Sequence, residues 1–310
     1  MSIITATDVV KKYGSLRALD GFSCSIPKGI TGILGPNGAG KTTFIKAFLG
    51  FHPFDEGQVF TLGEYHLPKD LMKIKDRIGY MPENDTRMIR TSAMTYVTHF
   101  GRLAGLPNNL AKTRAFDVLH YVGLEEARYR YMATFSSGML QRVKLATALV
   151  LDPEILLLDE PTAGMDPPGR EQMLKLISDL GQNHGIHIIL STHLLPDIER
   201  TSNYVVVISQ GKTVVEGDLH TVLERKSDII SLHIELLHEG NNTFARILEQ
   251  ENYDPIINGI DITVNINRKE ENDHYLKLFS LAKQNNLVIR KMTPYKQSLE
   301  DIFLDAVKED

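Results

Sequence analysis

The sequence contains a single cysteine, Cys24, and no long apolar segment. One cysteine excludes a disulfide framework and a cysteine-based metal site within one chain. The longest apolar runs stop far short of the ~18–20 residues that a membrane-spanning helix needs. The N-terminus lacks the basic flank and the long apolar core of a secretion signal. These absences favour a cytoplasmic protein.

An excess of basic charge is missing as well. The chain of 310 residues has a net charge of −5. Residues 226–310 hold 10 Lys and Arg against 15 Asp and Glu, and the charges of the remaining residues cancel. Nucleic-acid binding requires a basic face, so we expect no nucleic-acid partner. The length favours about two domains.

Three patterns follow one another along the first part of the chain. Residues 1–34 read as strands punctuated by Gly, Ser, Pro and Lys. Residues 92–134 have helical spacing, which indicates a mostly helical insertion at about 85–134. From residue 137 onward, helices alternate with short apolar strands. This alternation predicts a parallel sheet covered on both faces, hence an α/β fold.

The C-terminal segment, 226–310, has a different rhythm and no glycine-rich loop. Its expected elements are a strand over 229–236, a helix over 242–251, a strand over 260–266, a helix over 272–285, a strand over 287–292 and a helix over 298–308. We therefore predict two domains, an α/β domain over 1–225 and a small α+β accessory domain over 226–310.

A glycine-rich loop follows the apolar run from Ile30 to Leu34. It matches G-x-x-x-x-G-K-[ST] in full, between an expected strand and an expected helix. The glycines let backbone N–H groups wrap a phosphate, and the N-terminus of the helix adds partial positive charge. Lys41 offers a cation to the β- and γ-phosphates, and Thr42 offers a hydroxyl to Mg²⁺.

The nucleotide-binding residues predicted from this loop are Gly35, Pro36, Asn37, Gly38, Ala39, Gly40, Lys41, Thr42 and Thr43. The alternative is a glycine-rich turn with a chance lysine. The motif alone does not specify the reaction, because kinases, GTPases and transporters all use it.

Two carboxylates, Asp159 and Glu160, follow a buried strand, and His193 follows the next strand along the chain. Ligands in open α/β sheets sit beyond the carboxyl ends of the strands, so these residues should converge with the phosphate loop. Asp159 suits Mg²⁺, and Glu160 suits the deprotonation of an attacking water. The alternatives are a helix cap for the acidic pair and a solvent-exposed or structural role for His193.

Residues 135–142 read FSSGMLQR and resemble the signature segment of ABC-family ATPases. The phosphate loop, this segment, the acidic pair, the GMDP run at 164–167 and His193 stand in the order and spacing of that family. The resemblance covers residues 1 to about 225. It implies a P-loop NTPase fold of the ABC type, with an antiparallel β N-terminal subdomain, a parallel sheet core and a helical insertion.

The resemblance also implies a head-to-tail pair of subunits that sandwiches two ATP molecules. Ser136, Ser137 and Gly138 would then contact the γ-phosphate bound by the other subunit, and Tyr13 would stack on adenine. An ordinary capped helix is the alternative for the signature segment, and a core tyrosine is the alternative for Tyr13. Lys41, Glu160 and His193 are the residues that we expect to act in hydrolysis.

Three positions depart from the family pattern, and one of them is Phe135, which stands where the family usually has leucine. Ser137 stands where the family usually has glycine, and it adds a side chain near the expected γ-phosphate contact. Glu83 replaces the family's glutamine, which contacts Mg²⁺. A carboxylate can still ligate the metal beside Thr42 and Asp159, although it adds negative charge. A surface loop acid is the alternative for Glu83.

The C-terminal segment, which ends in SLEDIFL at 298–304, resembles the extension of exporter-type bacterial and archaeal subunits. It would act as a dimer brace or as a stabilising cap. The expected function is an ATP- and Mg²⁺-dependent ATPase that powers a separate multi-spanning permease, for export, from the inner face of the membrane. The partner in the ATP sandwich would be a second copy or a related subunit. The alternatives are a soluble ABC-type ATPase that remodels a ribosome or a nucleic-acid complex, and a nucleotide kinase.

Overall fold

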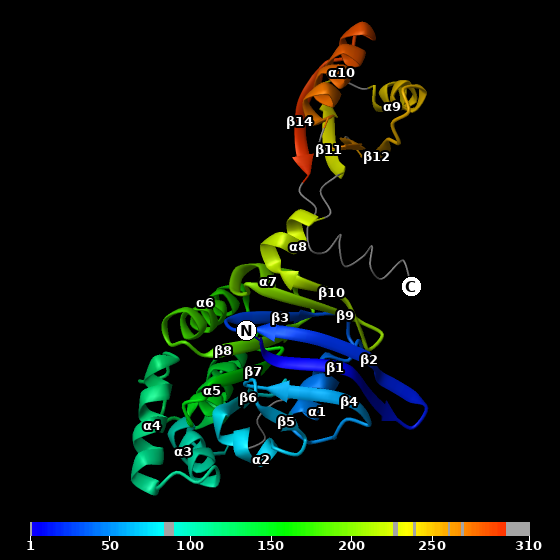
Figure 1. Cartoon of the computed structure of the whole chain (residues 1–310). Coiled ribbons are helices and arrows are strands. Elements are labelled where there is room, and N and C mark those ends of the chain that lie inside the picture. The colour runs from blue at the N-terminus through cyan, green and yellow to red at the C-terminus, as the bar shows by residue number, and fades with distance from the viewer. Residues whose placement is uncertain are drawn as a thin grey trace. The chain divides into compact units, whose positions relative to one another are not determined.

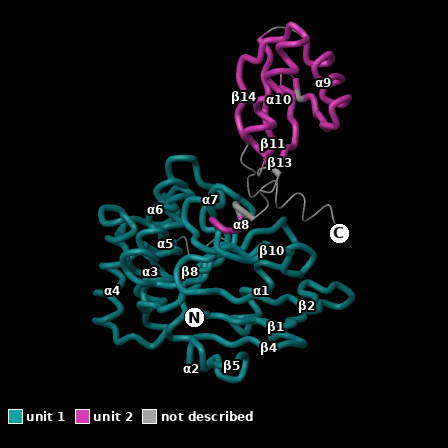
Figure 2. The backbone as a smooth tube through the Cα atoms, turned by 45° about the horizontal axis from the view of Figure 1, so that its top comes forward, with its two compact units in different colours: residues 1–219 teal, residues 220–310 magenta. Residues whose placement is uncertain are grey.

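The computed structural model describes most of the chain. The described residues are 2–83, 90–225, 229–237, 240–259, 261–267 and 270–295. The chain divides into two compact units, residues 1–219 and 220–310 (Figure 2). The domain boundary after residue 225 stays a prediction. The start of the helical insertion at 85 and the last expected helix, 298–308, which carries the whole SLEDIFL run, fall outside the described residues.

The first unit contains two sheets (Figure 1). Its strands are β1 (Ser2–Tyr13), β2 (Leu16–Pro27), β3 (Ile30–Leu34), β4 (Glu56–Thr61), β5 (Tyr65–Leu67), β6 (Ile78–Met81), β7 (Ile155–Asp159), β8 (His187–Thr192), β9 (Tyr204–Ser209) and β10 (Lys212–Asp218). One sheet is antiparallel, in the order β2-β1-β4-β5. The other has the order β10-β9-β3-β8-β7-β6 and is parallel except for β10.

Helices of the first unit connect these strands. They are α1 (Lys41–Phe48), α2 (Leu71–Ile74), α3 (Ala93–Leu103), α4 (Asn108–Tyr121), α5 (Ser137–Leu149), α6 (Pro167–Asn183) and α7 (Leu195–Thr201), with α8 (Leu219–Arg225) crossing into the second unit. Short 3₁₀ turns cover Lys75–Arg77 and Met132–Thr134.

The parallel sheet is the central layer because its side chains alternate between two apolar cores. In β7, Ile155 and Leu157 belong to the core shared with the antiparallel sheet and α1. Leu156 and Leu158 belong to the core shared with the helices α3 to α6. All five residues of β7 are buried, as expected for a strand covered on both faces. The predicted α/β fold with an antiparallel N-terminal sheet and a parallel core is confirmed.

The second unit is a small α+β fold. Its elements are β11 (Ile229–Leu236), α9 (Asn241–Gln250), β12 (Ile256–Asn258), β13 (Asp261–Asn267), α10 (Glu271–Gln284) and β14 (Ile289–Tyr295). The sheet order β12-β13-β11-β14, all antiparallel, makes this a β-α-β-β-α-β unit of the split βαβ type. Leu232, Ile234, Val264 and Phe244 are among the residues of its own apolar core.

Several elements differ from the sequence-based expectation. Strand β8 runs to Thr192, two residues past the apolar run 186–190 from which the strand is predicted. Helix α1 begins at Lys41, three residues before the segment 44–49 from which the helix is predicted. Strands β4, β5, β6, β10 and β12 were not predicted. In β4 only Val59 and Thr61 are buried, so the strand lacks the apolar run that would reveal it. Within the described residues, no helix is both long and apolar enough to cross a membrane.

Candidate functional site

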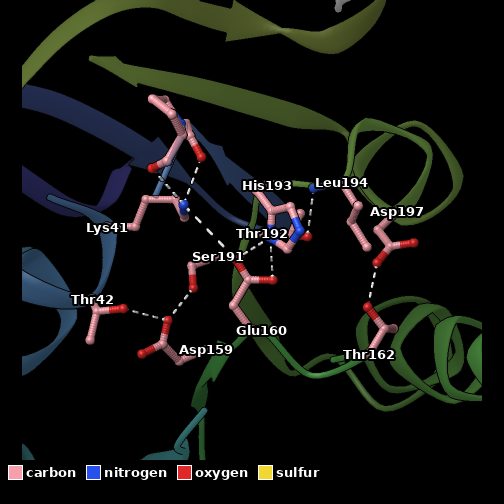
Figure 3. Close-up of polar contacts among 12 residues, drawn as sticks. Lys41, Thr42, Asp159, Glu160, Thr162, Ser191, Thr192, His193, Leu194 and Asp197 are labelled. Carbon is pink, nitrogen blue, oxygen red and sulfur yellow. Dashed lines mark hydrogen bonds and ion pairs between the residues drawn. The ribbon is translucent and has the colours of Figure 1, made fainter. Parts of the chain in front are cut away.

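The three strand ends that carry the predicted site lie side by side. Strand β8 pairs with β3 on one side and with β7 on the other, and all three are parallel. The register sets Leu34 against Thr192 and Asp159 against Ser191. The phosphate loop, the acidic pair and His193 therefore leave the sheet at one edge (Figure 3).

The phosphate loop needs glycine for reasons of space. A Cβ on Gly35 would lie 2.4 Å from the carbonyl oxygen of Ile208. Gly40 has a φ of 114°, and a Cβ there would lie 2.6 Å from the carbonyl oxygen of Ala18. Gly40 is also the N-cap of α1 and offers no side chain to the first N–H groups of that helix, which leaves them available to an anion.

A cavity of about 270 Å³, which we call the phosphate cavity, opens at this loop. Its lining residues are Asn37, Gly38, Gly40, Lys41, Thr42, Thr43, Glu83 and Glu160. Gly35, Pro36 and Ala39 shape the loop without lining the cavity. Glu83, which the sequence left open as a surface acid, therefore lies beside the phosphate loop.

Lys41 is buried at this cavity, with 6% of its surface exposed. Its Nζ donates hydrogen bonds to the carbonyl oxygens of Gly35 at 2.6 Å and Pro36 at 3.1 Å. It also lies 3.9 Å from a carboxylate oxygen of Glu160. Burial lowers the pKa of Lys41, and the carboxylates nearby oppose that shift.

Asp159 accepts two hydroxyl hydrogen bonds on the same oxygen. Thr42 Oγ1 donates to Oδ1 at 3.0 Å, and Ser191 Oγ donates at 2.5 Å. The other oxygen, Oδ2, is buried and has no hydrogen-bond partner among the described residues. A buried carboxylate oxygen without a donor is costly unless a cation satisfies it. A carboxylate beside a threonine hydroxyl is a donor set that suits Mg²⁺.

Glu160 is held in an unusual backbone conformation, with a φ of 49°. Its N–H donates to the carbonyl oxygen of Ser191 at 3.0 Å, and 6% of the residue is exposed. Both carboxylate oxygens contact Nδ1 of His193, at 2.9 and 3.0 Å. Since an ionised carboxylate only accepts, Nδ1 is the donor. Positive φ in a residue other than glycine is a strain that clusters at functional sites.

The signature residues lie at a different place on the same unit. Ser136 caps α5 by accepting a hydrogen bond from the N–H of Met139 at 3.3 Å. Ser136 and Gly138 line a second cavity of about 700 Å³, together with Met165 and Asp166, and Ser137 does not line it. The two cavities share no lining residue, so one chain does not bring its own signature segment to its own phosphate loop.

Tyr13 is 40% exposed at the end of β1, so it is not a core tyrosine. Its ring meets His52 edge to face at 5.7 Å, and Lys11 Nζ lies 5.5 Å from the ring centre. Tyr13 does not line the phosphate cavity. Its free ring surface is compatible with stacking on a base.

Sequence reasoning missed three partners of the site. Ser191 bonds Asp159, Lys144 bonds the backbone at Glu83, and Asp197 bonds Thr162 just after the acidic pair. Ser191 could have been found from its place at the end of a strand next to the acidic pair. Lys144 and Asp197 carry no local signal, because their partners lie 61 and 35 residues away.

Comparisons with known proteins place this geometry in a family. The model of the family described as ABC transporter matches residues 19–163. The linearmycin resistance ATP-binding protein LnrL of Bacillus subtilis (strain 168) is 30% identical over 306 residues, which cover 98% of this chain and 97% of the relative. The chain belongs to the ABC transporter ATP-binding proteins. It is the ATP-binding and ATP-hydrolysing subunit of a transporter.

Other relatives of this ABC subunit agree. The bacitracin transport ATP-binding protein BcrA of Bacillus licheniformis is 31% identical, with 99% of this chain and 97% of the relative covered. The structure of cbiO1 from Clostridium perfringens, part of the ABC transporter complex cbiONQ, matches with a TM-score of 0.64 and 28% identity. That match covers 73% of this chain and 92% of cbiO1. The family assignment favours a transporter over an ATPase that acts on ribosomes or nucleic acid.

Proposed function

We propose that this subunit binds ATP with Mg²⁺ at the phosphate cavity and pairs head to tail with a second copy or a related subunit. It then powers export through a separate multi-spanning permease at the inner face of the membrane. One observation carries the proposal for the site. The ammonium of Lys41, the hydroxyl of Thr42, the unpaired oxygen of Asp159 and the carboxylate of Glu160 lie together at one edge of the sheet.

Different residues would bind different parts of ATP. The N–H groups at the start of α1 and the ammonium of Lys41 hold the β- and γ-phosphates. Tyr13 offers its exposed ring to adenine. Mg²⁺, when bound, neutralises charge on the β- and γ-phosphates. Thr42, Asp159 and Glu83 would hold the ion. No cluster of three His, Cys, Asp or Glu suited to a metal is found in the described ranges, so water and phosphate oxygens would complete the coordination.

The chemical step depends on Glu160. Its carboxylate orients a water molecule toward the γ-phosphorus and accepts a proton as the new P–O bond forms. The bond to the β-phosphate oxygen breaks, and ADP leaves with the electron pair. His193 holds Glu160 through Nδ1. Lys41 Nζ lies 3.9 Å from the same carboxylate and places a positive charge beside it.

The separation of the two cavities supports the head-to-tail pair. Ser136 and Gly138 at the N-terminus of α5 face a cavity that lacks a phosphate loop. A second subunit could supply ATP there, and Ser137 would stand beside that contact. The names of the relatives support export: they include a resistance protein and the Nod factor export ATP-binding protein I of Sinorhizobium fredii, which is 35% identical over 236 residues.

Replacement of Glu160 tests the chemistry. We expect Glu160→Gln to bind ATP, to lose about 10²- to 10⁴-fold in turnover and to accumulate as a closed dimer with ATP. The matched control is Glu154→Gln, at the opposite end of the strand β7, which should turn over ATP normally. Phosphate release and light scattering measure these outcomes. Unchanged turnover in Glu160→Gln would remove this residue from the mechanism.

The transport role has its own test. Affinity purification of the full chain from membranes should co-isolate a multi-spanning protein. Recovery of ribosomes or nucleic acid instead would favour the soluble ATPase.

A further inference from the structure

Lys144 is a buried lysine on the signature helix α5, with 3% of its surface exposed. Its Nζ donates hydrogen bonds to the carbonyl oxygens of Pro82 at 3.0 Å and Glu83 at 2.9 Å. Burial of an ammonium group is expensive unless its donors are satisfied. These two hydrogen bonds therefore attach the backbone at Pro82 and Glu83 to the side of helix α5.

Helix α5 and strand β6 are also in direct backbone contact. A Cβ on Gly79 would lie 2.3 Å from the carbonyl oxygen of Ala148. The strand can approach the helix this closely only because Gly79 has no side chain. Contacts at Gly79 and at Glu83 hold both ends of β6 against α5, so that the helix and the strand move as one body.

This body connects two places that the proposed function uses. At the N-terminus of α5, Ser136 and Gly138 line the second cavity. Glu83, whose carbonyl oxygen bonds Lys144 of α5, lines the phosphate cavity of the same chain. Lys144 stands seven residues, or about two helical turns, after the first residue of α5 and bonds the Glu83 end.

We propose that Lys144 is a positioning residue that couples the two ATP sites of the dimer, and this inference rests on the proposed function. When the N-terminus of α5 engages ATP on the second subunit, the helix carries the backbone at Glu83 with it. That movement sets Glu83 against Mg²⁺ and ATP in its own phosphate cavity. Lys144 lines neither of the two cavities, so its proposed action on the phosphate cavity passes through the backbone at Glu83.

Helix α5 has a separate connection to the segment that follows Glu160. Gln141 Nε2 donates to the carbonyl oxygen of Ala163 at 2.9 Å, three residues beyond Glu160. Loss of Lys144 would leave that connection in place. The consequence of the loss should therefore fall on the metal requirement, which involves Glu83, and not on nucleotide retention by the phosphate loop.

The variant Lys144→Met keeps the length and packing of the side chain but cannot bond the two carbonyl oxygens. We expect unchanged ATP affinity, a fall of about 10- to 100-fold in kcat, and a rise of similar size in the Mg²⁺ concentration that gives half-maximal turnover. Lys144→Arg keeps the charge and the donors, so it should recover part of the turnover. The matched control is Thr147→Val on the same helix. The Thr147 hydroxyl donates to the carbonyl oxygen of Val143 at 2.8 Å, within α5, so this variant should leave ATP affinity, kcat and the Mg²⁺ dependence unchanged.

Two results for Lys144→Met would overturn the inference: wild-type turnover and Mg²⁺ dependence, or a parallel loss of ATP affinity and turnover. Absence of hydrolysis in the wild-type chain would instead overturn the proposed function itself. If Lys144→Met does not fold, hydrogen exchange of the Glu160→Gln chain tests the coupling instead. ATP should protect residues 78–83 and the N-terminal turns of α5 over the same concentration range. Protection of α5 alone would refute the coupling.

Discussion

Asp197 is a fully buried carboxylate in α7 whose two oxygens have different partners. Arg170 Nε donates to Oδ1 at 2.6 Å, and Arg170 Nη2 lies 2.5 Å from the same oxygen without being aligned to donate. Thr162 Oγ1 donates to Oδ2 at 2.6 Å (Figure 3). The carboxylate thus joins the segment after Glu160, the helix α6 and the helix that follows His193.

The magnitude of an Asp197→Ala change follows from these contacts. Breaking a buried ion pair costs about 3–5 kcal/mol because it leaves one charge unpaired. The Arg170 side chain is 28% exposed, so water reaches it and the lower end, about 3 kcal/mol, applies. Thr162 is 3% exposed, and its unpaired hydroxyl adds about 1 kcal/mol. A total of about 4 kcal/mol should lower the melting temperature of the first unit by about 8–16 °C.

Scanning calorimetry of the full chain measures this loss, because it can resolve the transition of the first unit. The control is Glu171→Ala on α6, which breaks an exposed pair with Lys175 at 3.0 Å. Exposed pairs contribute at most about 1 kcal/mol, so the control should melt within a few degrees of the wild type. Equal melting temperatures for Asp197→Ala and Glu171→Ala would refute the argument that burial sets the cost.

Two further outcomes are expected. Burial lowers the pKa of Lys41, whereas bound phosphates favour its charged form, so ATP affinity should be full below the lowered pKa and weaken as the pH rises through it. Calorimetric titration from neutral to alkaline pH checks this, and a Lys41→Met chain with the same alkaline loss would contradict it. Gly79→Ala should destabilise the first unit by about 1–3 kcal/mol, since the new Cβ would overlap the Ala148 carbonyl. Urea denaturation measures the change, and a stability equal to wild type would mean that β6 can move away from α5.

The local sequence predicted much of the fold and the identity of the site residues. The phosphate loop could be read directly, because its chemistry depends on glycine, lysine and threonine at fixed spacing within eight positions. The buried strands β3 and β7 and the alternation of helices and strands were also readable, since burial on both faces requires short apolar runs. Weakly apolar strands such as β4, and β10 with its half-buried residues, gave no such signal.

Only the tertiary structure decided how those residues are held. The sequence places Asp159 after a strand, but the pairing of β7 with β8 brings Ser191 to one of its oxygens and leaves the other without a partner. The positive φ of Glu160 and the bond from Lys144 to Glu83 likewise depend on chain segments far apart in the sequence. Spacing along one chain reports local backbone chemistry, whereas contacts between distant segments depend on the packing of the whole unit. For that reason the sequence determined which groups we expect to act on ATP. The fold determined their distances, their burial and the helix through which we expect two sites to communicate.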